Sequence, residues 1–279
     1  MREFKSFYKE VSGNEGNKCH YNKRLDTYGC GCQHDCSYCY AKSLLSFRGL
    51  WNNEDPSIAD IAAIERKLKK IPVGTILRLG GMTDCFQPIE KLHRVTYETI
   101  KLLNKYRIGY LIVTKSSIVA DDEYLEIMDK ELAHIQITVT TLDDELCKSY
   151  EKASPPSERV KAILKLQERG FDVAIRLSPI IEEYMDFDKL NSLGIKKCIV
   201  EFLRVNSWIE KWFKIDYSKY TLKQSGYRHL PLEEKKRILE RIEIPIKSVC
   251  EDVTEHFFYW QENVNPNKDD CCNLSRGEK

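Results

Sequence analysis

The sequence predicts an α/β fold with a parallel sheet, and three observations support this prediction. Short apolar runs rich in β-branched residues alternate with amphipathic segments along most of the 279 residues. Helix start signals stand between these runs, and hydrophobic residues form 42% of the chain, enough for a substantial core. Alternation of this kind predicts right-handed βαβ units with parallel strands.

Six apolar runs are predicted to be strands, because buried parallel strands are short, continuous and apolar. They cover residues 25–30, 75–79, 110–114, 135–140, 173–177 and 198–203. Helix start signals predict four helices between them. These are 58–70 after Asp55-Pro56, 88–106 from Pro88, 122–132 after Asp121, and a helix after Ser154-Pro155 that ends at Gly170.

The composition excludes several classes of protein. The 44 Lys and Arg residues balance 43 Asp and Glu residues, so a net charge of +1 gives no overall field that would attract nucleic acid. The first residues form no apolar signal segment and no run approaches transmembrane length, so we expect a cytoplasmic protein with no membrane contact. Eleven cysteines in such a chain indicate metal ligands and reduced thiols rather than disulfides.

Three cysteines with the spacing C-x3-C-x2-C follow the first predicted strand, where α/β barrels place their chemistry. Cys32, Cys36 and Cys39 can bind three irons of a cubane [4Fe–4S] cluster and leave the fourth iron free for a small molecule. An electron carrier would supply four cysteines, so the spacing favours catalysis. Structural zinc is the alternative, with Cys30 or His34 as fourth ligand, although four ligands within ten residues are unusual for zinc.

With Tyr38 directly before its last cysteine, this loop resembles the signature of the radical S-adenosylmethionine (SAM) superfamily. Further runs resemble its spore photoproduct lyase-like branch, namely residues 83–88, 113–116, 138–143, 153–159 and 178–180. The resemblance implies an open, partial (β/α)6 barrel, since six units are too few for a closed eight-stranded barrel. It places that core at residues 25–205, between a short N-terminal extension at 1–24 and a helical or irregular C-terminal extension at 206–279.

The resemblance also implies a reaction. A reduced [4Fe–4S] cluster would cleave SAM into methionine and a 5′-deoxyadenosyl radical, which would abstract a hydrogen atom from an unidentified substrate. Nucleic acid or a nucleotide is the first hypothesis for that substrate, and an electron donor such as flavodoxin or ferredoxin is the implied partner. The competing hypothesis is a non-catalytic nucleic-acid module that binds zinc or an iron–sulfur cluster.

Six residues resemble SAM-binding residues of the family: Tyr38, Gly80, Gly81, Asp84, Lys115 and Thr138. By resemblance, the glycines would expose backbone to the amine of SAM, and the aspartate would add a counter-charge. The lysine and the threonine would reach the methionine carboxylate, and the tyrosine would lie against the adenine. The structural alternatives are a tight turn, a solvated lysine, a strand-forming threonine and a packed tyrosine.

The hydrogen donor is a further expectation. In the lyase itself, a cysteine at the end of the second strand donates a hydrogen atom, and Gly81 stands at that place in this chain. Cys85, four residues further on, is a candidate donor. The alternative for Cys85 is a buried, inert thiol.

The C-terminal region carries two features of its own. Residues 208–229 interleave six aromatic residues with five basic ones, which predicts either a nucleic-acid surface or a helix that packs its aromatic side chains inward. Cys250, Cys271 and Cys272, with His256 between them, are candidate ligands of a second metal or redox-active thiols.

The remaining candidates have a structural and a functional interpretation. Cys19, Cys147 and Cys198 are predicted to be structural thiols. Glu201 and Arg204 follow the last predicted strand, where they either face a cavity or form a salt bridge at the rim of the barrel.

Overall fold

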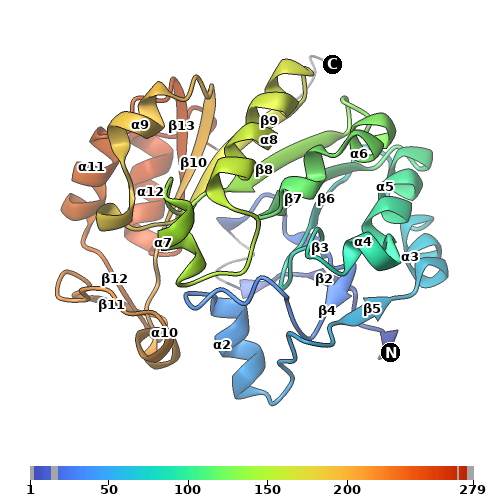
Figure 1. The fold of residues 1–279 in the computed structure, drawn as a ribbon, viewed down its shortest axis with the longest axis horizontal. Coiled ribbons are helices and arrows are strands. Elements are labelled where there is room, and N and C mark those ends of the chain that lie inside the picture. The colour runs from blue at the N-terminus through green and yellow to red at the C-terminus, as the bar shows by residue number, and fades with distance from the viewer. Residues whose placement is uncertain (1–2, 14–17, 269, 275–279) are drawn as a thin grey trace.

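The computed structural model describes residues 3–13, 18–268 and 270–274, and its centre is one curved eight-stranded sheet (Figure 1). The strand order is β13-β10-β9-β8-β7-β6-β3-β2, and all neighbours are parallel except β2 and β3. The strands are β2 (Tyr8–Glu10), β3 (Lys23–Leu25), β6 (Ile76–Leu79), β7 (Gly109–Thr114), β8 (Ala133–Thr138), β9 (Asp172–Ile180), β10 (Lys197–Phe202) and β13 (Ile246–Cys250). The predicted α/β fold with a mainly parallel sheet is confirmed.

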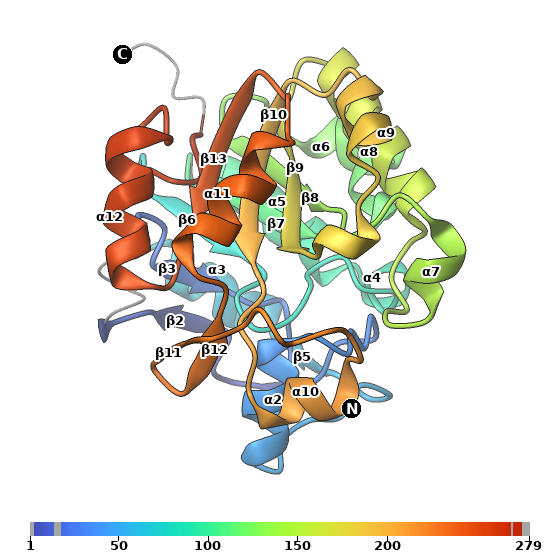
Figure 2. The same cartoon turned by 90° about the vertical axis from the view of Figure 1, so that its left-hand side faces the viewer.

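Helices cover the outer face of this sheet (Figures 1 and 2). The longer ones are α3 (Ile61–Leu68), α5 (Val95–Lys105), α6 (Asp122–Ile127), α8 (Pro156–Glu168), α9 (Phe187–Ser192), α11 (Leu232–Glu240) and α12 (Thr254–Asn263). Shorter turns lie between them, at α4 (Glu90–His93), α7 (Asp144–Lys148), η1 (Ser117–Ala120) and η2 (Glu182–Tyr184). Among the described residues, no helix has the length and apolarity that a membrane span needs.

The two faces of the sheet differ, because successive side chains of a strand point to opposite faces. Tyr110 and Ile112 of β7 belong to the main apolar core, whereas Leu111 between them packs in a smaller cluster with Tyr21 and Cys271. The same alternation on β9 places Arg176 and Ser178 against an interior cavity. The inner face of the sheet therefore presents polar side chains to this cavity.

The first predicted strand is wrong in its bounds. β3 ends at Leu25, and Tyr28–Gly29 forms β4 of a separate three-stranded sheet with β1 (Glu3–Phe4) and β5 (Ser57–Ala59). The chain leaves the main sheet at Asp26, whose carboxylate accepts hydrogen bonds from the backbone N–H groups of the loop after β6. β3 therefore ends where the Asp26 side chain begins to anchor the loop after β6.

Three predicted helices have different bounds. The helix predicted at 58–70 begins only after Asp60, whose carboxylate accepts the N–H groups of Ala62 and Ala63 at 3.1 Å, so Asp60 and not Asp55 is the N-cap. The helix predicted at 88–106 is divided into α4 and α5 at Arg94, which has φ 54°. The helix predicted at 122–132 ends at Ile127. The helix after Ser154-Pro155 is confirmed as α8.

The two extensions both contribute strands to the main sheet. β2 of the N-terminal segment pairs with β3, and β13 of the C-terminal segment pairs in parallel with β10. The sequence did not predict β13, because Pro245 and Lys247 interrupt its apolar pattern. The rest of the C-terminal segment contains α10 (Ser207–Trp212), the hairpin of β11 (Leu222–Gln224) and β12 (Tyr227–His229), α11 and α12.

Candidate active site

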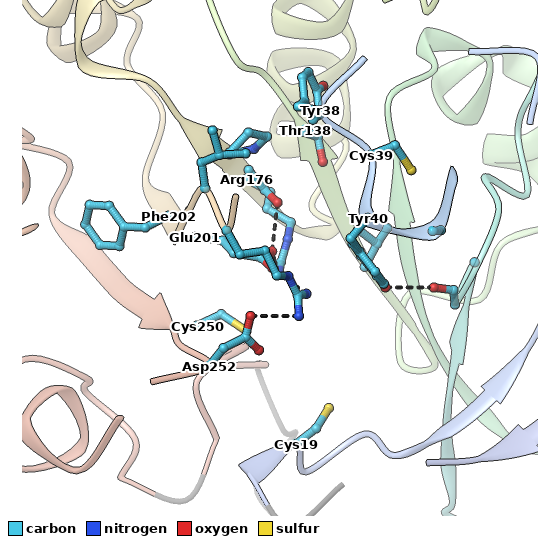
Figure 3. A pocket seen from close by; sticks show the side chains of 18 of the residues that line it. Cys19, Tyr38, Cys39, Tyr40, Thr138, Arg176, Glu201, Phe202, Cys250 and Asp252 are labelled. Carbon is cyan, nitrogen blue, oxygen red and sulfur yellow. Dashed lines mark hydrogen bonds and ion pairs between the residues drawn. The ribbon is translucent and has the colours of Figure 1, made fainter. Parts of the chain in front are cut away.

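A cavity of about 360 Å³ lies at the carboxyl ends of the main strands. Its wall includes Gly80 after β6, Lys115 after β7, Thr138 at the end of β8, Ser178 in β9, Glu201 in β10 and Cys250 at the end of β13. Figure 3 shows Tyr38, Thr138 and Cys39 toward one end of this cavity, and Cys250 and Cys19 toward the other. Parallel α/β folds place their active sites at this edge.

The cysteine loop, residues 30–39, presents three thiols to the cavity. Cys32, Cys36 and Cys39 all line it, whereas Cys30 is absent from its wall. Two tight turns shape the loop: the N–H of Asp35 donates to the Cys32 carbonyl at 3.1 Å, and the N–H of Cys39 donates to the Cys36 carbonyl at 3.2 Å. The spacing of the motif therefore places all three cysteines on the wall of one cavity.

The last cysteine of the loop also caps a helix. The sulfur of Cys39 accepts the N–H of Lys42 at 3.4 Å, and α2 (Tyr40–Phe47) begins at the next residue. The positive end of the α2 dipole thus lies at the Cys39 sulfur and favours negative charge on it.

Contacts from both flanks fix the loop. Gly31 is required there, since a Cβ atom would lie 1.8 Å from the backbone oxygen of Asn52. The side-chain oxygen of Gln33 accepts the N–H of Ile89 at 2.7 Å, and its backbone N–H donates to Gln87 at 2.8 Å. These bonds tie the cysteines to the segment between β6 and α4, so the loop is held in place before any cofactor binds.

The three thiols fit a cluster better than a single ion. Among the described residues, no three His, Cys, Asp or Glu side chains are arranged to hold one metal ion. Sulfurs around zinc would lie within about 4 Å of one another, because Zn–S bonds are about 2.3 Å long. On a cubane each thiolate binds a different iron, so wider separations are expected. The zinc alternative therefore has less support than the cluster.

Burial of the loop affects the charge of its thiols. Burial raises the pKa of the Cys32 thiol to about 12 and, together with Glu151, holds the pKa of Cys36 well above its ordinary value. Both thiols are therefore protonated at neutral pH unless a cation is bound. Because iron is held by thiolates, cluster assembly on this loop must release protons.

The glycine turn after β6 is built for close packing. Gly80 has φ +80°, and an added Cβ would lie 2.9 Å from the Thr83 carbonyl oxygen. The Gly81 N–H donates to the Asp26 carboxylate at 2.7 Å, and its carbonyl accepts the Tyr40 hydroxyl at 3.1 Å. Sequence reasoning missed Asp26 and Tyr40; only the position of Tyr40 directly after the motif could have indicated its role.

Asp84 connects the loop after β6 with its neighbours. Its carboxylate accepts the Thr114 hydroxyl and the Lys115 N–H, both at 2.7 Å, and lies 3.2 Å from Nε2 of His34. Burial alone would raise the pKa of Asp84, but His34 and these hydrogen bonds outweigh burial and lower it to about 2. Asp84 lines the cavity, and its two oxygens are already engaged by protein groups.

Lys115, Thr138 and Tyr38 occupy the same part of the cavity wall. The Lys115 ammonium lies 5.5 Å from the centre of the Tyr38 ring, and the Tyr38 hydroxyl donates to the Glu151 carboxylate. Thr138 is buried at the end of β8, and its carbonyl accepts a hydrogen bond from Arg159 at 3.0 Å. Three residues that the resemblance singles out are therefore neighbours in space.

A buried ion pair supports the cysteine loop from behind. Glu151 and Arg159 are both fully buried and bonded to each other, and Glu151 lies 3.7 Å from the Cys36 sulfur. Burial would raise the pKa of Glu151, but Arg159 and Lys115 lower it to about 2. The carboxylate therefore stays charged and fixes the Tyr38 side of the loop.

Other candidates lie apart from the cavity or are engaged in packing. Cys85 is fully buried and is absent from the cavity wall. In the basic aromatic stretch, Phe213 and Tyr220 are buried in the main core, and Arg228 pairs with Glu210 at 2.8 Å. Inward packing therefore accounts for part of this stretch.

The charged residues at the end of β10 face the cavity. Glu201 pairs with Arg176 at 2.6 Å, and Arg204 pairs with Asp252 at 2.8 Å. The Arg204 guanidinium also lies 4.3 Å from the centre of the Tyr40 ring. Both interpretations of Glu201 and Arg204 hold, since they line the cavity and form salt bridges there.

Comparison with known proteins identifies the family. A family model described as the radical SAM superfamily matches residues 27–190, and the chain belongs to this superfamily. Its fold matches that of spore photoproduct lyase solved with dinucleoside spore photoproduct, with a TM-score of 0.62 at 15% identity over 88% of this chain and 79% of the lyase. The predicted superfamily and the likeness to the lyase are confirmed.

Further similarities extend this picture. Methylornithine synthase shares the fold, with a TM-score of 0.53 at 14% identity over 84% of this chain and 65% of the synthase. An uncharacterized protein of Methanocaldococcus jannaschii is 26% identical over 239 residues, which are 79% of this chain and 87% of the relative. An uncharacterized protein of Acidianus two-tailed virus is 22% identical over 173 residues, 55% of this chain and 54% of the relative.

Membership of the superfamily implies an enzyme that uses a [4Fe–4S] cluster and SAM. The residues of the loop fit the cluster, because three of its cysteines line the cavity and the fourth, Cys30, does not. The cavity also fits a polar cofactor, since backbone of the glycine turn and the Lys115 ammonium lie on its wall.

Proposed function

We propose that this chain reductively cleaves SAM at the cysteine loop and directs the resulting 5′-deoxyadenosyl radical to a hydrogen atom of a nucleotide or nucleic-acid substrate. One observation carries the proposal: the loop thiols and the ends of β6 to β13 share a single cavity. Substrate and cofactor could therefore meet inside the barrel, where water is excluded from a reactive radical.

The roles of the residues follow from their chemistry. Cys32, Cys36 and Cys39 would hold three irons, and the cluster when bound supplies the electron that breaks a carbon–sulfur bond of SAM. Lys115 would act as a compact cation for the methionine carboxylate, with the Thr138 hydroxyl beside it. Asp84 would hold the loop after β6 in place from its buried position rather than bind the amine through a free oxygen.

Glycine backbone and an aromatic ring would complete the cofactor site. The turn at Gly80 and Gly81 would place backbone carbonyl groups near the amine of SAM, since neither residue carries a side chain. Tyr38 would present one edge of its ring to the adenine while its hydroxyl stays bonded to Glu151. An uncharged aromatic edge suits the flat, apolar faces of a purine.

The substrate class is proposed from the charge of the cavity wall. Six cationic side chains line the cavity against four carboxylates. Such an excess of positive charge favours an anionic substrate such as a nucleotide or a strand of nucleic acid. Tyr227 and Phe257 on the same wall add aromatic surface on which a base could stack.

The electron would come from a low-potential carrier such as flavodoxin or ferredoxin. Because the competing hypothesis is a non-catalytic module, turnover decides between them. Anaerobic protein with SAM, dithionite and a deuterated nucleotide or oligonucleotide should form 5′-deoxyadenosine that carries deuterium. The formation of unlabelled 5′-deoxyadenosine with every nucleotide and nucleic-acid probe would contradict the substrate class, and its complete absence would contradict the enzyme.

A further inference from the structure

Four cysteines from three distant parts of the chain meet at the other end of the cavity. Cys19 precedes β3, Cys250 ends β13, and Cys271 and Cys272 lie in the described C-terminal segment 270–274. All four line the cavity, and we name them the four-cysteine group. Cys19 was predicted to be a structural thiol; the fold instead brings it to the three C-terminal cysteines.

The members of the group contact one another. Cys271 and Cys272 lie in one small buried cluster, and Cys19 and Cys250 pack against it. Cys19 therefore lies near the three C-terminal cysteines. Since none of the four forms a disulfide, the group offers four free thiols in one place.

The backbone that carries the last two cysteines is firmly held. The Ser248 hydroxyl of β13 donates to the Cys271 carbonyl at 2.8 Å, and the Cys272 N–H donates to the Asp270 carboxylate at 2.9 Å. Asp270 in turn accepts the hydroxyl of Tyr21, which follows Cys19 by two residues. Both segments are therefore built into the barrel, so the positions of the sulfurs are set by the fold.

Arginines surround the group. Arg24 and Arg78 lie beside Cys19, and Arg176 lies beside Cys250 and Cys272. Ordinary buried thiols behave as small apolar side chains and gain nothing from such neighbours, whereas three guanidinium groups beside them favour a bound group of negative charge.

One arginine lacks an acceptor there. The buried Nε atom of Arg78 has no hydrogen-bond acceptor among the described residues. Arg78 also lies close to Cys272, so the unsatisfied donor and the thiol group belong to one site. An anionic group bound by the cysteines would give the Arg78 Nε its acceptor.

We propose that Cys19, Cys250, Cys271 and Cys272 hold a second iron–sulfur cluster inside the barrel. Four thiolates are the complete ligand set of such a cluster, which then carries the net negative charge that the arginines match. A single zinc ion fits less well, because no group of the described residues is arranged around one ion and because Cys271 and Cys272 are adjacent. On a cluster each of these neighbours can bind its own iron.

The histidine that the sequence offered as a companion ligand lies away from the four-cysteine group. His256 is buried in α12, is absent from the cavity wall, and lies 3.9 Å from the Glu251 carboxylate. The fourth ligand is therefore Cys19 rather than His256, and the second cluster ties both ends of the chain to the sheet.

The test measures iron and acid-labile sulfide per chain after anaerobic reconstitution of two sets of variants, with EPR spectra of the reduced proteins. A loop variant, Cys32→Ala with Cys36→Ala and Cys39→Ala, should retain about two to four irons per chain and an EPR signal. A group variant, Cys250→Ser with Cys271→Ser, should lose that signal and keep the iron of the loop. Cys198→Ala is the matched control. It removes a different buried thiol, in β10, and should lose no iron.

Three results would overturn the inference. These are a folded loop variant that binds no iron, a loop variant that binds zinc instead, and a folded group variant with the iron content of the unchanged protein. If the group variant does not fold, the loop variant alone decides the question. The inference does not depend on SAM cleavage, so a loop variant that keeps its iron supports it even if the unchanged protein never forms 5′-deoxyadenosine.

Discussion

The Asp84 carboxylate accepts the backbone N–H of Lys115 at 2.7 Å and so ties the loop after β6 to the end of β7. The same carboxylate accepts the Phe86 N–H at 2.8 Å and lies beside His34 of the cysteine loop. Three segments that border the cavity thus depend on one side chain. Both of its oxygens face hydrogen-bond donors.

Replacing Asp84 with Asn should destabilise the protein. The amide nitrogen cannot accept a hydrogen bond, so one backbone N–H is left without its acceptor, at a cost of about 1–3 kcal/mol in the free energy of unfolding. Urea unfolding of the iron-free protein measures this. Asp188→Asn, at an exposed position of α9, is the control and should change the free energy by less than about 0.5 kcal/mol. Equal effects of the two variants would show that Asp84 does not hold the loops.

A pair of glycines tests the packing of the turn after β6. Gly80 and Gly74 have nearly equal φ angles, +80° and +81°, but only a Cβ at Gly80 would meet a neighbour, the Thr83 oxygen at 2.9 Å. Both changes to Ala cost about 1–2 kcal/mol from the left-handed backbone. Gly80→Ala should cost about 1–3 kcal/mol more, because the clash is with backbone. Thermal unfolding measures the difference. If both variants have the same melting temperature, the prediction is wrong.

The sequence predicts those parts of the fold and site that depend on local pattern. The cysteine spacing places three thiols on one loop, and the β-branched runs of β7, β8 and β9 are where the periodicity puts them. Anchoring contacts are different, because Asp26 reaches Gly81 across 55 positions of the chain. No local pattern identifies such a partner.

Removing Arg159 should be far more harmful than removing an exposed cation. Arg159→Met leaves the Glu151 carboxylate buried without its partner, which should cost about 3–5 kcal/mol in the free energy of unfolding. Lys105→Met breaks an exposed pair with Glu65 at 2.9 Å and should lower the free energy of unfolding far less, because solvent screens that pair. Adding Glu151→Gln to Arg159→Met should recover much of the loss. No recovery in the double variant would argue against an unpaired charge as the cause.

The pH dependence of stability should contain a contribution from Glu182. Hydrogen bonds from Arg237 lower the pKa of Glu182 to about 2, so the folded state favours the charged carboxylate. This stabilisation is complete above the unfolded value of about 4.5 and is lost as the pH falls toward 2. Glu182→Gln should therefore destabilise the iron-free protein by about 1 kcal/mol at pH 7, since Arg237 is partly exposed and solvent screens the pair.

Below pH 4.5 the difference in the free energy of unfolding between Glu182→Gln and the unchanged protein should become smaller. Urea unfolding at several pH values from 7 to 3 measures it. Glu183→Gln, at the exposed neighbouring position, should stay within about 0.5 kcal/mol of the unchanged protein at pH 7. If the difference in the free energy of unfolding between Glu182→Gln and the unchanged protein instead grows as the pH falls, the assigned ion pairs are wrong.

The site is less predictable where the chain ends return to the barrel. Cys19 and Cys250 are 231 positions apart, yet both line the cavity because β13 joins the sheet beside β10. Pro245 and Lys247 hide that strand from a search for apolar runs. Without β13 the sequence offers no reason to place the N-terminal cysteine with the C-terminal ones, and Cys19 looks like an isolated thiol.

The formation of 5′-deoxyadenosine tests the central claim most directly. The reconstituted protein should release it from SAM and dithionite without oxygen, whereas Cys36→Ala should release none, because two thiolates cannot hold three irons of the cluster. Cys30→Ala, outside the cavity wall, should keep the activity. If Cys36→Ala cleaves SAM as well as the unchanged protein does, the cysteine loop is not the site of the reaction.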